Sequence, residues 1–173
     1  YKSMAEIVNK IANSPLITFN LEDYYPKGKR VQIDIKEWLF QGIILKEKDF
    51  RLELKAHDWK QYEDAYVSLH CSADSIIPSW AYLLLTTYLE NIAQKVVFGS
   101  IEVLNSLLYQ EALSKIDLTD YKDKPIIIKG CSDKPVPENA YLLALQMLQP
   151  IAKSIMYGEA CSAVPLYKKP KKR

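Results

Sequence analysis

The sequence predicts an α/β fold of three layers, in which helices cover a mainly parallel sheet. The first observation is an internal repeat: residues 66–99 and 126–158 share one order of apolar, cysteine, proline and glycine residues. The second is that each copy opens with a short apolar run of the kind found in strands buried on both faces. The third is that apolar residues then recur at helical spacing after a proline, before a last short apolar run that ends in glycine. The chain is therefore predicted to be built on a duplicated β-α-β unit.

The two copies match closely in their helical parts. Pro78 corresponds to Pro137, and the Ala-Tyr-Leu-Leu of residues 81–84 recurs at 140–143, while the loop before the helix is one residue shorter in the second copy. A Cys-Ser pair lies between strand and helix in each copy. We expect both strands to be parallel in one sheet, with these cysteines at its carboxyl edge, where open parallel sheets bind ligands.

Several elements precede the first repeat. Residues 1–3 lie before Met4, and we expect them to be a remnant of expression that has no part in the fold. Residues 5–12 place apolar side chains on one helical face. Residues 16–21 and 31–35 alternate apolar and polar positions, which predicts an N-terminal strand flank, either an edge hairpin or an antiparallel pair.

The remaining elements are predicted helices and loops. Residues 35–40 have helical spacing that ends near Gly42, and residues 46–56 predict an amphipathic surface helix packed on the sheet. Between the repeats, residues 101–113 predict a further helix. Residues 117–124 form a charged loop that leads into the second repeat strand.

Length and composition favour a cytoplasmic protein of one domain, residues 1–173, which is long enough to bury a core without disulfides. No apolar run approaches the roughly 18 residues of a membrane span, and no export signal opens the chain. The formal charge of +2 is dominated by the basic tail, residues 168–173, so the rest of the chain is mildly acidic. This pattern argues against broad nucleic-acid binding, apart from weak contact through that tail.

The three cysteines are the main candidate site. Cys71, Cys131 and Cys161 are each followed by serine, and an odd number of cysteines does not suggest a disulfide framework. If all three leave the sheet at one edge, their thiolates could bind zinc or an iron-sulfur cluster. The repeat aligns Glu102 with Cys161, and Asp74 follows Cys71, so both carboxylates are candidates near an open coordination position. Capping of a helix N-terminus is the favoured alternative for Asp74.

Other interpretations of the cysteines stay open. Cys71 or Cys131 could be the nucleophile of an enzyme or carry a persulfide, although His57 and His70 are poorly placed in sequence to serve as a base. The cysteines could equally be small buried residues in tight turns. A structural or interaction module, such as a homodimer formed through the aromatic repeat helices, is a third possibility. The sequence contains no glycine-rich nucleotide motif, zincin motif or nucleophile elbow.

Three stretches together resemble a known family: residues 47–51, the His-Asp-Trp turn at 57–59 and, above all, residues 71–82. They are similar to an uncharacterised bacterial family, domain of unknown function 2480, over about residues 6–169. The resemblance implies no particular reaction and no catalytic residues, because the family has none assigned. Its genes often neighbour those of sulfur-mobilisation iron-sulfur assembly, so the resemblance implies iron-sulfur assembly proteins as partners.

Overall fold

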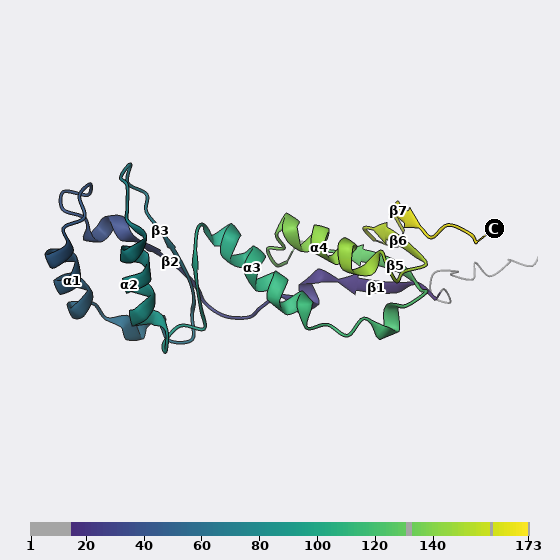
Figure 1. The fold of residues 1–173 in the computed structure, drawn as a ribbon. Coiled ribbons are helices and arrows are strands. Elements are labelled where there is room, and N and C mark those ends of the chain that lie inside the picture. Colours follow the sequence, from purple (N-terminus) through teal and green to yellow (C-terminus); the bar gives the residue numbers. More distant parts are fainter. Residues whose placement is uncertain (1–14, 131–132, 160, 173) are drawn as a thin grey trace, which may run out of the picture. The chain divides into compact units, whose positions relative to one another are not determined.

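The computed structural model describes residues 15–130, 133–159 and 161–172, which form a mixed α/β fold (Figure 1). Helices accompany two mainly parallel sheets, so the predicted α/β class is confirmed. The helix predicted over residues 5–12 lies outside the described residues, as do residues 1–3. In the described residues, no helix has the length and apolar character that crossing a membrane requires.

The described residues fall into two compact units. One is Pro26–Leu108, called here the inserted unit, and the other combines the described residues through Tyr25 with those from Tyr109 onward, called here the terminal unit. Each unit contains one sheet, and each is described by itself. Whether the units fold together as one domain, as predicted for residues 1–173, stays a prediction.

The inserted unit holds a parallel sheet of strand order β2-β3-β4. Its strands are β2 (Arg30–Asp34), β3 (Tyr66–His70) and β4 (Lys95–Phe98). Its helices are η2 (Ile35–Trp38), α1 (Glu47–Ala56), η3 (Trp59–Tyr62) and α2 (Ser79–Leu89), and α3 (Ile101–Ser114) begins here and ends in the terminal unit.

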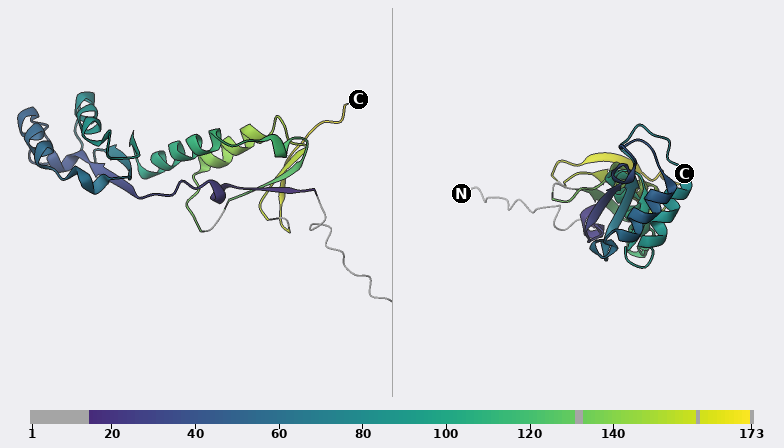
Figure 2. Two further views of the ribbon diagram at one scale, coloured as in Figure 1. Left: turned by 90° about the horizontal axis from the view of Figure 1, so that it is seen from below. Right: turned by 90° about the vertical axis from the view of Figure 1, so that its left-hand side faces the viewer.

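The core of the inserted unit lies between its sheet and two helices. Phe50 of α1 and Leu85 of α2 are fully buried and share one apolar cluster with Val67 of β3. Figure 2 shows α1 and α2 on the same side of this sheet. In α2, the buried positions Ala81, Leu85 and Leu89 recur every fourth residue, which is the spacing of one helical face. The repeat pattern therefore predicted this helix correctly.

The terminal unit holds a sheet of strand order β1-β5-β6-β7, in which only the β6–β7 pair is antiparallel. Its strands are β1 (Ile17–Asn20), β5 (Pro125–Lys129), β6 (Ser154–Tyr157) and β7 (Val164–Lys168). Its helices are η1 (Leu21–Tyr24), η4 (Thr119–Tyr121) and α4 (Glu138–Leu148). Its apolar cluster joins α4 to the central strand β5, as in the inserted unit.

Two topological predictions are wrong. The strands of the two repeat copies do not share a sheet, because β3 pairs with β2 and β5 pairs with β1. The flank is neither a hairpin nor an antiparallel pair, since β1 and β2 lie in different sheets and each runs parallel to its partner. Each flank strand completes a separate sheet around one repeat strand. Both copies do contain a strand, a helix and a second strand in this order, while their superposition stays a prediction.

Candidate functional site

Five side chains gather at the carboxyl edge of the β2-β3-β4 sheet. They are called here the edge cluster, and they are Asp34, His70, Cys71, Ser72 and Tyr82. Parallel pairing places Asp34 directly beside His70, so the ends of β2 and β3 meet at one edge. The chain then turns through residues 71–78 into α2, whose first turn carries Tyr82. This is the edge at which open parallel sheets bind ligands.

Asp34 holds the loop that contains Cys71. One carboxylate oxygen accepts hydrogen bonds from the backbone N–H groups of Lys36 and Ser72, both at 3.0 Å. The other accepts the Ser72 hydroxyl at 2.5 Å and lies 4.0 Å from His70 Nε2. Partial burial opposes ionisation, but the bonds from Ser72 and Lys36 outweigh it and lower the pKa of Asp34. The side chain is therefore an anion that fixes the start of the loop.

Cys71 and Tyr82 both pack against the apolar cluster of the inserted unit. The Cys71 thiol is free and partly buried against the apolar cluster of the inserted unit, with Sγ 3.9 Å from the carbonyl oxygen of Ala73. Burial, followed by the nearby charges of Cys71 and Asp34, raises the pKa of Tyr82. Tyr82 therefore keeps its proton at neutral pH, and its hydroxyl is able to donate a hydrogen bond to negative charge at this edge.

The end of β4 places an exposed aromatic side chain beside the edge cluster. Phe98, the last residue of β4, packs edge-on against the Tyr82 ring with centroids 5.0 Å apart, yet 65% of its surface is exposed. An accessible thiol, a protonated phenol and a fixed carboxylate are suited to nucleophilic chemistry at sulfur. They also leave an apolar surface for the body of a ligand.

The predicted metal ligands are only partly described. Cys131 lies outside the described residues. Cys71, Asp74 and Glu102 belong to the inserted unit and Cys161 to the terminal unit, where it is exposed. Hydrogen bonds from its own backbone and from Ser100 lower the pKa of Glu102 at the start of α3. Within residues 15–130, 133–159 and 161–172, no group of three or more His, Cys, Asp or Glu side chains is arranged to hold a metal ion.

The sequence did not identify Asp34 or Tyr82 as site residues, and it indicated that His70 is poorly placed to serve as a base. Asp34 ends the alternating apolar pattern of residues 31–35, so its position at a strand end was visible in the sequence. Its partner was not visible, because the pairing of β2 with β3 joins residues far apart in the chain. Tyr82 recurs as Tyr141 in the repeat, which favoured packing over a role at the site.

The terminal unit has a related edge with different chemistry. Glu22 accepts hydrogen bonds from the backbone N–H groups of Asp133 and Lys134, both at 3.1 Å, so a carboxylate again fixes the loop after the central strand. Where the inserted unit has His70, the repeat places Lys129, whose ammonium lies 2.8 Å from Glu159. This edge therefore presents an ion pair rather than an imidazole.

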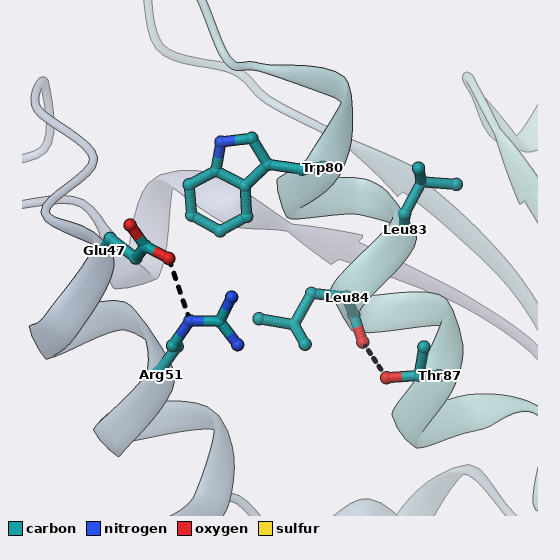
Figure 3. A pocket seen from close by; sticks show the side chains of 6 residues that line it. All are labelled: Glu47, Arg51, Trp80, Leu83, Leu84 and Thr87. Atoms are coloured by element: carbon teal, nitrogen blue, oxygen red, sulfur yellow. Dashed lines mark hydrogen bonds and ion pairs between the residues drawn. The ribbon is translucent and has the colours of Figure 1, made fainter.

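A separate pocket lies between α1 and α2, with a volume of about 350 Å³. Figure 3 shows Arg51 lying between Glu47, its ion-pair partner at 3.1 Å, and the side chain of Leu84. The guanidinium also lies 5.8 Å from the centroid of the Trp80 ring. Glu47 and Arg51 form the only ion pair that the structure describes between side chains of this pocket. Because their charges neutralise each other, the pocket offers a mainly apolar surface.

The comparisons identify a family. A family model described as "Protein of unknown function (DUF2480)" matches residues 5–169. No curated protein and no solved structure gives a significant match. Because the family model covers almost the whole chain, this protein belongs to the DUF2480 family of proteins of unknown function.

Proposed function

We propose that this protein is a cysteine-dependent sulfur carrier, in which Cys71 accepts a sulfur atom as a persulfide and passes it to an acceptor. The observation that carries the proposal is that Cys71, a free and partly buried thiol, lies at the start of a loop fixed by Asp34 and packs against the same apolar cluster as Tyr82. The sequence alone offered Asp74 close to Cys71, but not the strand pairing that brings Asp34 to this loop. The edge cluster supplies several polar groups within one compact unit.

The proposed step is an exchange between two sulfur compounds. The Cys71 sulfur attacks the outer sulfur of a donor persulfide, R–S–SH, and the donor's S–S bond breaks. The products are Cys71 persulfide and the donor thiol R–SH, which takes up the proton released by Cys71. Atoms and electrons balance without an added oxidant, and the reverse exchange delivers sulfur to an acceptor.

Each polar residue has a separate role in this proposal. Tyr82 donates a hydrogen bond to negative charge on the Cys71 sulfur, before attack and in the persulfide anion. Asp34 positions the loop through Ser72 and has no free role as a base, because its oxygens already accept three hydrogen bonds. His70 lies beside Asp34, with Nε2 4.0 Å from its carboxylate, and is partly exposed at the rim of the cluster.

Under this proposal, the protein acts in a bacterial cytoplasm and has iron-sulfur assembly proteins as its partners. Reduced thiols and persulfides persist in a reducing compartment, and Cys71 and Cys161 are both free thiols. A persulfide carrier needs a donor and an acceptor protein. Cluster assembly is a process that consumes sulfur in this form.

The test is to incubate the reduced protein with glutathione persulfide and to locate the added sulfur by peptide mass mapping. We expect a mass gain of one sulfur atom on Cys71, and loss of that gain in Cys71→Ser. The matched control is Cys161→Ser, which removes an exposed thiol from the other unit and should leave loading at Cys71 unchanged. Loading on Cys131 or Cys161 alone, with Cys71 unmodified, would contradict the proposal.

Metal binding by Cys71, Cys131 and Cys161 is a second proposal. It is supported by the free thiols of Cys71 and Cys161, which are available as ligands for zinc or an iron-sulfur cluster. The test is elemental analysis of protein purified without oxygen, for the intact chain and for each single cysteine-to-serine variant. Stoichiometric metal that is lost in all three variants supports shared ligation, and metal-free protein contradicts it.

A further inference from the structure

A groove on the outer face of α1 combines aromatic surface with negative charge. It consists of two neighbouring pockets of about 410 and 400 Å³ that share Trp38, Leu52 and Glu53. Glu37 and Asp49 line the first pocket, and His57 lines the second. This surface is called here the acidic groove. It is separate from the edge cluster and from the pocket between α1 and α2.

Local structure explains why these side chains gather. Asp49, Glu53 and Ala56 follow one another at helical spacing along α1, so they form a single stripe. Leu52 lies next to this stripe with 57% of its surface exposed. Trp38 ends η2, and its ring is held in place by edge-on contacts with Phe50 and His57 at centroid distances of 6.2 and 5.2 Å. The groove therefore has a fixed aromatic wall.

Among the described residues, no basic side chain that lines the acidic groove pairs with its carboxylates. Glu37, Asp49 and Glu53 form no ion pair within 4.0 Å with any side chain that the structure describes. The one lysine that lines the groove, Lys46, instead lies over the Phe40 ring, with its nitrogen 3.4 Å from the centroid. Three carboxylates beside an indole therefore face solvent.

This combination is suited to a cationic, extended peptide. Indole faces attract ammonium and guanidinium groups, and carboxylates at the rim add Coulombic attraction. Aromatic grooves also bind proline-containing segments, because proline restricts the peptide to an extended shape before it binds. A basic segment that contains proline meets both requirements.

The chain itself carries such a segment at its C-terminus. Residues 168–173 contain five basic residues around Pro170. Lys168 and Lys169 are anchored in the terminal unit, through β7 and through a bond of 3.1 Å from Lys169 to Asp123. Lys171 and Lys172 are exposed and form no ion pair with the described residues. We propose that the acidic groove binds the basic tail of a second copy of this chain.

The test is a complementation experiment with two full-length variants. In the groove variant, Glu37→Gln, Asp49→Asn and Glu53→Gln remove the three carboxylates. In the tail variant, Lys171→Gln, Lys172→Gln and Arg173→Gln remove the last three positive charges of the sequence. Association is measured by sedimentation velocity at low and high salt, because docking between opposite charges weakens as salt screens them.

We expect the unmodified chain to self-associate and each variant alone to lose most of that association. An equal mixture of the two variants should regain it, since one copy retains the groove and the other the tail. Addition of a synthetic peptide of residues 167–173 should dissociate the complex.

Two control proteins carry the same changes in charge at other sites. One contains Glu63→Gln, Glu90→Gln and Glu138→Gln, and the other contains Lys60→Gln, Lys122→Gln and Lys153→Gln. Both should associate as the unmodified chain does. Lack of association in the unmodified chain and in the mixture, or equal loss in the control proteins, would overturn the proposal.

Discussion

The carboxylate of Asp34 in β2 accepts both the backbone N–H of Ser72 at 3.0 Å and its hydroxyl at 2.5 Å. This pair of bonds joins the end of one parallel strand to the loop that follows its neighbour. Because Cys71 directly precedes Ser72, the position of the thiol depends on a side chain from a different strand. The hydrogen bonds of Asp34 therefore link the pairing of β2 with β3 to the positions of the side chains in the edge cluster.

Replacement of Asp34 by alanine should destabilise the protein. The change leaves the N–H groups of Ser72 and Lys36 without their acceptor, and such losses cost about 1–3 kcal/mol when the groups are shielded from water. Because this edge is partly exposed, we expect the lower part of that range. The measurement is urea unfolding. Asp74→Ala is the matched control, since it removes an exposed aspartate from the same loop and should change the unfolding free energy by less than about 0.5 kcal/mol.

The contribution of Asp34 should also depend on pH, with a predictable sign. Its hydrogen bonds lower the pKa of the carboxyl in the folded protein, so the unfolded chain binds its proton first as the pH falls. The stability that Asp34 contributes is therefore present above the ordinary aspartate pKa of about 4 and is lost as the pH falls through the lower folded value. The difference in unfolding free energy between the unmodified chain and Asp34→Asn should shrink between about pH 5 and pH 2. A constant difference over that range would contradict the assignment.

The sequence predicted individual elements better than it predicted their partners. The repeated apolar spacing located α2 and α4 correctly, because helical periodicity is a local property that neighbouring residues determine. The pairing of β2 with β3 was not predictable in this way, since Val31 and Ile33 show the same alternation whichever strand lies beside them. One sheet was therefore expected where two are present. The carboxyl-edge position of Cys71 followed from the strand-loop-helix order, whereas Asp34 entered the site only through that long-range pairing.

Two neighbouring leucines of α2 should respond very differently to truncation. Leu85 is fully buried between α2 and the sheet, whereas Leu83 is 65% exposed. Leu85→Ala should lower the unfolding free energy by about 2–5 kcal/mol, because it removes buried methyl groups and leaves a cavity. Leu83→Ala should cost less than about 1 kcal/mol, since little apolar surface is lost from contact. Similar losses in urea unfolding of both variants would show that Leu83 is covered in solution.

Tyr82→Phe tests the proposed hydrogen-bond donor to the Cys71 thiol without removing the ring. The phenyl group retains the edge-on contact with Phe98, so the fold should be preserved, while the hydroxyl that we propose as the donor is lost. A sulfur anion at Cys71 then forms less readily, since charge-assisted hydrogen bonds to an anion contribute about 1.5–3 kcal/mol when they are shielded from water. Alkylation of Cys71 by iodoacetamide at neutral pH should therefore slow by about tenfold, because 1.4 kcal/mol corresponds to one factor of ten. The exposed Cys161 in the same molecule provides the internal control, and its rate should not change. An unchanged alkylation rate of Cys71 in Tyr82→Phe would show that the Tyr82 hydroxyl does not act on the thiol. Tyr82 would then have only a packing role against Phe98.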